Sequence, residues 1–360
     1  MEKRQVRRSR FWACLVASLA AVTATCSSYP VDTSGRNLLE LQSVWQYLKV
    51  YSIWQDSVPL AKNAFIYSTP ESLLASVIDT LHRYQYTRYV DTTPVGPSAM
   101  ESGAARAEAA SPVYFARISA RTGYVRIFTF DRADLFDSFL VAVPFLARFQ
   151  NIMLDLRSNT GGSIAMMDSV IEYFLPVNTP YIEATYRSYD SDARSASTRI
   201  ERWTTKHVPA ASLTGKNIVI LMNRFSASAS EMLAAGIKDG RRLAGLGTCK
   251  FVGDTSFGKG IGQVVVNRKQ FRKPDIQITF LRVTRACGCA DSVYHRIGMA
   301  PDTLVVNSVS AIADTAQFFA AFNVLEPGAR PDVIIFTQFL AKSIAQGADH
   351  TVPAISDFEN

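Results

Sequence analysis

The sequence predicts a layered α/β core in which most strands pair in parallel. Apolar runs typical of buried strands, such as residues 151–156 and 218–222, are each followed by a turn of small or polar residues and then by a helical pattern. Strands and helices that alternate in this way are typical of a largely parallel sheet covered by helices. The length of 360 residues allows a sizeable core and an accessory domain.

The amino terminus has the features of an export signal. Five of the first ten residues are basic and one is acidic, and residues 11–24 are apolar over about the length of a signal-peptide core. We therefore predict that residues 1–25 are a signal peptide and that the mature protein is periplasmic or lies in the cell envelope. The pair Arg7-Arg8 fits a twin-arginine signal poorly.

Cys26 stands where a lipoprotein box would place its cysteine. The preceding residues, Thr23, Ala24 and Thr25, make this an imperfect box. Lipidation of Cys26, with membrane anchoring, and simple cleavage nearby both stay open.

The charge balance argues against nucleic-acid binding. The formal net charge is +7, but the first ten residues contribute +4 of it, which leaves only +3 for the remaining chain. The basic character therefore belongs to the export signal and not to a binding surface for nucleic acid.

Three cysteines, Cys249, Cys287 and Cys289, lie in the body of the chain. In an oxidising compartment we expect a disulfide from Cys249 to Cys287 or Cys289. Free thiols are the alternative. A zinc site is disfavoured because His295 is only a weak candidate for the missing ligand, so no metal is predicted.

The amino-terminal part is predicted to be a small helical domain over residues 36–90. Apolar residues recur there at helical spacing, and Pro70 after Ser68 and Thr69 predicts the start of a helix that continues through Leu81. The proline- and glycine-containing residues 91–112 read as a linker.

Three later segments are also predicted from pattern alone. Residues 186–206 are polar and rich in serine and arginine, which indicates a surface loop, with a flap as the alternative. Residues 113–118 and 124–128 are expected to be paired strands, and residues 133–149 a helix. The predicted boundaries are 113–310 for the core and 311–360 for the carboxyl-terminal helices.

A serine-rich turn carries the first chemical signal. The residues Ser-Ala-Ser-Ala-Ser-Glu at 226–231 stand between a predicted strand and a predicted helix. A sharp turn of this kind holds a hydroxyl at an exposed corner, with the backbone N–H groups of the helix start directed at the ligand. Lys259 follows between two glycines, with Gln263 four residues further. A lysine can deprotonate a serine when burial lowers its pKa.

A pair of glycines carries the second signal. Gly161 and Gly162 lie between the predicted strand 151–156 and a helix, and such glycines free backbone N–H groups to face an anion.

Four motifs then occur in order and resemble those of the carboxyl-terminal processing, or tail-specific, serine peptidases. They are Asp-Leu-Arg-Ser-Asn-Thr-Gly-Gly from residue 155, Ser-Ala-Ser-Ala-Ser-Glu from 226, Phe-Gly-Lys-Gly-Ile-Gly-Gln from 257 and Gly-Met-Ala-Pro-Asp from 298. The resemblance covers about residues 124–306, with a weaker echo from 38 to 90. It implies a ClpP/crotonase-like layered core that follows a small helical domain.

The resemblance also implies roles for single residues. Ser228 would be the nucleophile, Lys259 the general base and Gln263 the residue that orients the lysine. The Ala229 N–H and one of the Gly161 and Gly162 N–H groups would form the oxyanion hole. Asp302 receives no catalytic role, and the implied exported peptidase needs no cofactor and acts on protein or peptide substrates.

Two features leave alternatives open. Residues 91–112 are too few for the peptide-binding PDZ domain that many relatives carry there, so the mode of substrate capture is not predicted. A catalytically silent peptide- or ligand-binding protein on the same fold is one alternative, and an acyl-CoA enzyme of the crotonase type is another. The oligomeric state is not predicted.

Overall fold

The computed structural model describes most of the predicted core and parts of the amino-terminal region. The described residues are 41–42, 44–45, 47–49, 52–53, 70–77, 80–81, 84–90, 111–190, 195–247, 249–266, 275–289, 292–306 and 315–332. The predicted signal peptide, Cys26, nearly all of the linker and the second carboxyl-terminal helix fall outside these ranges. Within them, no helix combines the length and the apolar character needed to span a membrane.

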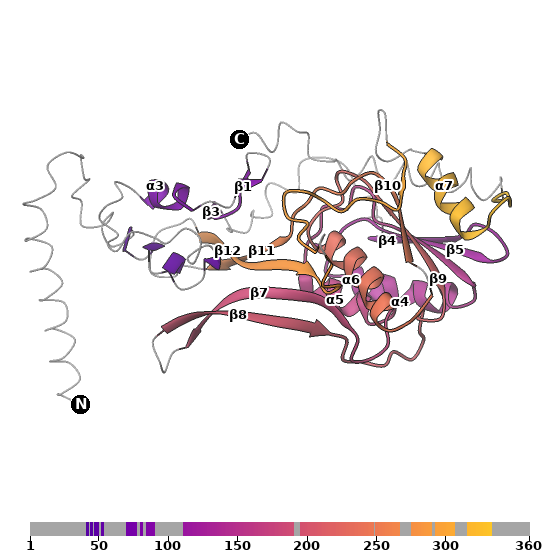
Figure 1. Ribbon diagram of the computed structural model, residues 1–360, viewed down its shortest axis with the longest axis horizontal. Helices are drawn as coiled ribbons and strands as arrows, with labels where there is room; N and C mark the ends of the chain where they lie inside the picture. Colours follow the sequence, from indigo (N-terminus) through magenta and orange to yellow (C-terminus); the bar gives the residue numbers. More distant parts are fainter. Residues whose placement is uncertain are drawn as a thin grey trace, which may run out of the picture.

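A six-stranded sheet forms the core of the part of the molecule at the right of Figure 1. Its strand order is β13-β10-β9-β6-β5-β4, and every neighbouring pair is parallel except β4 with β5. The strands are β4 (Val113–Arg117), β5 (Thr122–Ile127), β6 (Asn151–Asp155), β9 (Asn217–Met222), β10 (Cys249–Gly253) and β13 (Thr303–Leu304). The prediction of a layered, largely parallel α/β core is confirmed.

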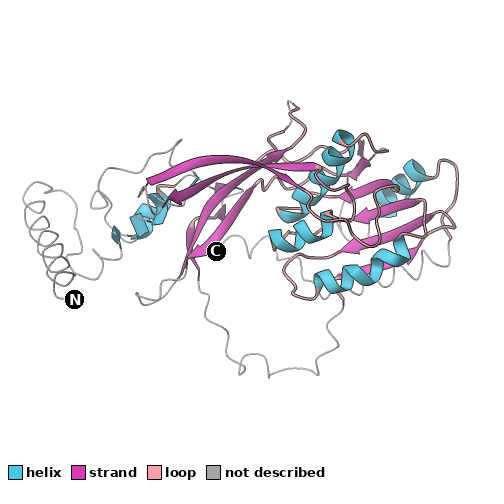
Figure 2. Ribbon diagram, turned by 90° about the horizontal axis from the view of Figure 1, so that it is seen from below, coloured by secondary structure: helices cyan, strands magenta, loops and turns pink. Residues whose placement is uncertain are grey.

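Helices cover both faces of this sheet (Figure 2). Successive residues of a strand point to opposite faces. On β6, Leu154 packs with the larger cluster and Met153 with the smaller one. The larger cluster lies under α4 (Leu135–Leu146), α5 (Ile164–Ile171) and α6 (Ala229–Leu243), and the smaller one under α7 (Thr315–Leu325). Burial on both faces explains why the strands read as unbroken apolar runs.

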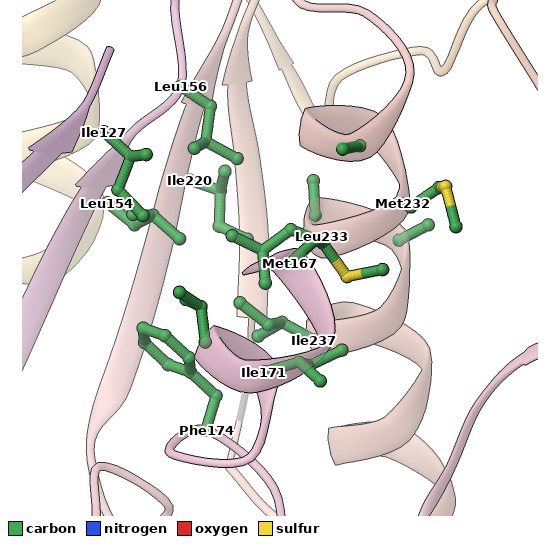
Figure 3. Close-up of a cluster of buried hydrophobic side chains, with 14 of the residues drawn as sticks. Ile127, Leu154, Leu156, Met167, Ile171, Phe174, Ile220, Met232, Leu233 and Ile237 are labelled. Atoms are coloured by element: carbon green, nitrogen blue, oxygen red, sulfur yellow. The ribbon is translucent and has the colours of Figure 1, made fainter. Parts of the chain in front are cut away.

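The larger cluster fixes the two helices that flank the candidate site. Met167 and Ile171 of α5 interlock with Leu233 and Ile237 of α6 above the strand residue Ile220 (Figure 3). Gly236 on α6 permits this approach, because a methyl group there would lie 2.6 Å from Ile171 Cδ1. α5 and α6 therefore start at fixed positions beside the sheet.

A second sheet extends away from the core (Figure 1). It contains β11 (Ile261–Val266), β12 (Asp275–Arg285), β7 (Pro180–Asp190) and β8 (Ser195–Thr204) in that order, and β3 (Arg88–Val90) also pairs with β12.

The prediction of a polar loop over residues 186–206 is wrong, because β7 and β8 form a long antiparallel ribbon there. Cross-strand pairs stabilise this polar ribbon. Arg202 lies opposite Glu183 and forms an ion pair with it, and the apolar Trp203 lies opposite Ile182.

The amino-terminal prediction holds only in part. The described residues between 41 and 49 are helical, and α3 (Pro70–Ala75) begins at the predicted proline. The predicted continuation through Leu81 is wrong, because the helix ends at Ala75 and β1 (Thr80–Leu81) pairs with β2 (Tyr84–Gln85). The tyrosine- and threonine-rich sequence favours strands here, and the buried Thr87 Oγ1 accepts a hydrogen bond from the Thr279 N–H of β12.

The disulfide prediction is wrong in its partner. Cys287 is bonded to Cys289, and Cys249 is a buried free thiol. Cys249 begins β10, where its side chain packs into the larger hydrophobic cluster, whereas the other two cysteines lie in the turn after β12. The position of Cys249 inside the core therefore separates it from the turn that carries the other two cysteines.

A buried ion pair forms at the end of β6, and a tyrosine hydroxyl joins it to the neighbouring strand β5. Asp155 accepts hydrogen bonds from the Arg157 guanidinium, the shortest at 2.6 Å, and from the Tyr124 hydroxyl at 2.7 Å. Burial alone would raise the pKa of Asp155, but Arg157 and Arg126 outweigh it and lower the pKa to about 2. The pair holds the chain where it leaves the sheet towards Gly161.

We predict that Arg157→Met lowers the free energy of unfolding by about 3–5 kcal/mol, because the buried Asp155 loses its hydrogen-bonded ion-pair partner. Urea denaturation measures this loss. Arg132→Met is the control, since the exposed pair of Arg132 with Asp134 contributes about 0–1 kcal/mol. Equal losses in both variants would contradict the prediction.

The lowered pKa of Asp155 also predicts how the stability of the folded protein changes with pH. The contribution of Asp155 to the free energy of unfolding is complete above the unfolded-state pKa of about 4, and it is lost as the pH falls through about 2.

Candidate active site

Ser228 occupies a strained corner between β9 and α6. Its φ is 58°, a value that residues other than glycine rarely adopt. Two neighbouring serines are committed to the backbone, since Ser226 Oγ donates to Leu156 O at 2.9 Å and Ser230 Oγ donates to Asn159 O at 2.8 Å. Of the three serines of the motif, Ser228 is the one at the corner.

The glycine turn lies directly against this corner. A Cβ on Gly161 would lie 2.7 Å from Ser228 Cβ and 2.9 Å from the Ala229 nitrogen, so only glycine permits the contact. Gly161 and Gly162 have φ values of 101° and 130°, which favour glycine. The structure thus brings the predicted nucleophile together with both predicted glycines and Ala229.

Asn159 decides which glycine N–H group is available. Its Oδ1 accepts the Gly161 N–H at 2.9 Å, and its Nδ2 donates to Ile127 O at 3.0 Å. No acceptor is found within the described ranges for the N–H groups of Gly162 and Ala229. Gly162 is therefore the better-placed donor of the two predicted glycines.

The buried Glu231 carboxylate joins the serine corner to the lysine loop. Glu231 Oε2 accepts the Ser228 N–H at 2.9 Å and the Lys259 N–H at 2.8 Å. Oε1 accepts the Gly258 N–H at 2.7 Å and the Ser256 hydroxyl at 2.5 Å. Burial raises the pKa of Glu231 to about 7, and all four hydrogen bonds oppose the rise.

Lys259 is mostly enclosed. Burial lowers its pKa to about 8, the negative charges of Asp131 and Glu231 oppose this change, and Arg88 adds to it. The Lys259 Nζ lies 4.5 Å from the centre of the Tyr86 ring. An amine with a pKa near 8 is neutral in an appreciable fraction of molecules at neutral pH, which a general base requires.

Gln263 lies on β11 at an irregularity in the pairing with β12. Its Nε2 is buried and has no hydrogen-bond partner among the residues that the structure describes. A hydrogen bond from Gln263 to Lys259 is not seen there, so the orienting role stays a prediction.

Sequence reasoning missed four residues around Lys259. Glu231 was readable from the spacing Ser-x-x-Glu, which is the signature of a helix capping box. Tyr86, Asp131 and His295 carry no such signal, because they reach the lysine through the tertiary fold. His295 packs against Gly260, and burial lowers its pKa to about 4, so its imidazole is neutral.

Asp302, in the last of the four motifs, has a structural role. Asp302 accepts hydrogen bonds from the Phe251 N–H and from Lys238, which ties the last motif to α6 and β10. Across the described part of the chain, no group of three histidine, cysteine or acidic side chains is arranged to hold a metal.

A solved structure shares the fold over most of this chain. It is that of a lipoprotein from Streptococcus agalactiae, with a TM-score of 0.52 and 14% identity over 84% of this chain and 99% of that chain. At this identity the likeness concerns the fold alone.

Several curated sequences are similar over the core. The carboxy-terminal processing protease CtpB of Bacillus subtilis is 33% identical over 40% of this chain and 26% of its own length. The carboxyl-terminal-processing protease of Synechocystis is 26% identical over 49% of this chain and 37% of its own. This chain thus spans only about a quarter to two fifths of these relatives.

The family comparison covers the candidate site itself. The model of peptidase family S41 matches residues 121–305, about half of the chain, and this range includes the glycine turn, the Ser228 corner and the Lys259 loop. This protein therefore belongs to peptidase family S41.

Proposed function

We propose that this protein is a serine endopeptidase that hydrolyses peptide bonds with Ser228 as nucleophile and Lys259 as general base. One observation carries the proposal. A single buried carboxylate, that of Glu231, accepts the backbone N–H groups of both Ser228 and Lys259. Two residues far apart in the sequence are thereby fixed to one atom, Glu231 Oε2.

The reaction begins with Lys259 in its neutral form. The Lys259 amine accepts the Ser228 proton while Ser228 Oγ attacks the substrate carbonyl carbon. The lysine then returns the proton to the leaving amine, which gives an acyl-enzyme. Water then attacks the ester with Lys259 again as base, and the lysine passes the proton to Ser228 Oγ as the acyl product leaves. The lowered pKa of Lys259, about 8, makes the proton transfer feasible near neutral pH.

The negative charge of the tetrahedral intermediate needs two donors. The Ala229 N–H, at the start of α6, and the Gly162 N–H are the best-placed pair, because Asn159 already takes the Gly161 N–H. Loss of one such donor costs about 3–4 kcal/mol of transition-state stabilisation in comparable sites.

Glu231 acts as a positioning residue in this mechanism. It does not face the substrate, since it is fully buried and its two oxygens accept four hydrogen bonds. It fixes the backbone on both sides of the reacting pair, which lowers the entropic cost of bringing them together. Gln263 is proposed to orient the Lys259 amine once substrate binds.

The substrate class follows from family membership and is a proposal for the whole protein. Relatives are named as carboxy-terminal processing proteases, and we infer protein or peptide substrates here. Residues 91–112 between β3 and β4 are too few for a domain of ordinary size, so substrate capture is assigned to the core itself.

We predict that Ser228→Ala and Lys259→Ala each reduce peptide hydrolysis by at least about 10³-fold, because each removes a reacting group. Circular dichroism and thermal unfolding should show intact folds. Ser169→Ala, at a half-buried position, and Lys250→Ala, at an exposed one, are matched controls outside the site and should retain activity. Full activity in either site variant would refute the dyad.

The pH dependence of the wild type extends this test. Only neutral Lys259 accepts a proton, so kcat/KM should rise with pH along a limb with an apparent pKa of about 8.

We predict that Glu231→Gln lowers kcat by about 10²-fold or more and destabilises the fold by about 2–4 kcal/mol. The NH2 group of the new amide replaces one carboxylate oxygen, so it faces at least one buried backbone N–H group whose hydrogen bond it cannot accept. Removing the negative charge also lowers the pKa of Lys259, so the rising limb should move to lower pH.

The matched control for this variant is Glu172→Gln. Glu172 also accepts backbone N–H groups, those of Lys206 and His207, but at the surface. A Glu231→Gln enzyme with unchanged kcat, and with an unchanged pH dependence of kcat/KM, would argue against the positioning role.

We predict export, with removal of residues 1–25 and, if the box is used, lipidation of Cys26. Mass spectrometry of the amino-terminal peptide from envelope fractions tests this directly. A lipid adduct should be present on Cys26 and absent from a Cys26→Ala variant, whereas an intact Met1 terminus in the mature protein would contradict export.

A further inference from the structure

An acidic side chain stands beside the proposed oxyanion donor. A Cβ built on Gly162 would lie 2.5 Å from Asp131 Oδ1 and 2.5 Å from the Asp131 nitrogen. The Asp131 N–H donates to Thr129 Oγ1 at 3.1 Å, which helps to fix the backbone of this residue. The Asp131 carboxylate therefore lies against the glycine turn that contacts Ser228.

This carboxylate is exposed and makes no hydrogen bond or ion pair within the described part of the chain. The neighbouring Arg132 does not neutralise it, because the Arg132 guanidinium is paired with Asp134. Glu231, the other acidic group near the site, differs in being fully buried and saturated with donors. Asp131 is thus the accessible negative charge of the site.

Asp131 also interacts electrostatically with Lys259. Partial burial raises the pKa of Asp131 above its ordinary value, and the positive charge of Lys259 opposes this rise. The other groups around Lys259 are Glu231 on α6, Arg88 on β3 and the neutral His295. When Lys259 is neutral, as its role as base requires, it supplies no positive charge to Asp131.

We propose that Asp131 binds a lysine or arginine side chain of the substrate at a position next to the scissile bond. This inference rests on the proposed peptidase function. A carboxylate beside the Gly162 N–H opposes the negative charge that develops on the substrate oxygen. A cationic substrate side chain against Asp131 cancels this repulsion, and the benefit is largest in the transition state.

The size of the preference follows from the exposure of the site. Exposed charge pairs change binding by up to about five-fold, and repulsion of an acidic side chain adds a similar factor. We therefore expect a peptide with lysine beside the scissile bond to be cleaved with a kcat/KM about ten-fold above that of its glutamate counterpart. Raising the salt concentration should reduce this ratio.

The test uses quenched fluorescent peptides that carry lysine, glutamine or glutamate on either side of the cleaved bond. The full-length wild type should prefer lysine, Asp131→Asn should lose most of the preference, and Asp131→Lys should favour glutamate. Asp137→Asn, an exposed aspartate on α4, makes the same charge change and should keep the wild-type preference.

Labelling of Ser228 by a fluorophosphonate separates the two levels of failure. Absent labelling in the wild type would reject the proposed peptidase function, and this inference with it. Labelled enzyme that shows no lysine preference, or the same preference in Asp131→Asn, would overturn the inference alone. An equal loss for all peptides in Asp131→Asn, with a shifted pH limb, would make Asp131 only a counter-ion of Lys259 and would also overturn it.

Discussion

The buried carboxylate of Glu231 is the constraint on which the rest of the site depends. No cation of the described residues forms an ion pair with it, and three backbone N–H groups and one hydroxyl supply its hydrogen bonds instead. An acidic group with this burial is costly unless every acceptor position is used. The turn at Ser228 and the loop at Gly258 must therefore keep the conformations that point their N–H groups inward. The strain at Ser228, with its positive φ, is balanced by this bonding.

The parallel sheet explains why these segments meet. β6, β9 and β10 are neighbours and run in the same direction, so their carboxyl ends lie at one edge. The glycine turn follows β6, the serine corner follows β9 and the lysine loop follows β10. Binding sites in open α/β sheets form at this edge for the same reason. The buried pair of Asp155 and Arg157 fixes the segment that follows β6. Asn159 joins this segment to the serine corner, because its backbone oxygen accepts hydrogen bonds from the Ala227 N–H and the Ser230 hydroxyl.

The sequence was informative where local pattern and tertiary environment agree. β6, β9 and α6 are strongly periodic and buried, so their types and approximate limits could be predicted, as could the turn that carries Ser228. Prediction failed where pairing with a distant strand decides the outcome. The polar ribbon of β7 and β8 is stabilised by cross-strand pairs, and the segment after Ala75 forms strands and reaches β12. Asp131 and Tyr86 could not be assigned to the site, because no spacing rule connects them with Lys259.

The protonation state of Lys259 reflects a balance that no single neighbour sets. Burial and Arg88 favour the neutral amine, whereas Asp131, Glu231 and the face of the Tyr86 ring favour the ammonium. A lysine with a much lower pKa would be a weak base for the serine proton, and one with its ordinary pKa would be charged near neutral pH and unable to accept the proton. A pKa near 8 lies between these limits. The same negative groups then stabilise the ammonium that forms during attack, so the charges that oppose neutrality before the reaction assist the proton transfer within it.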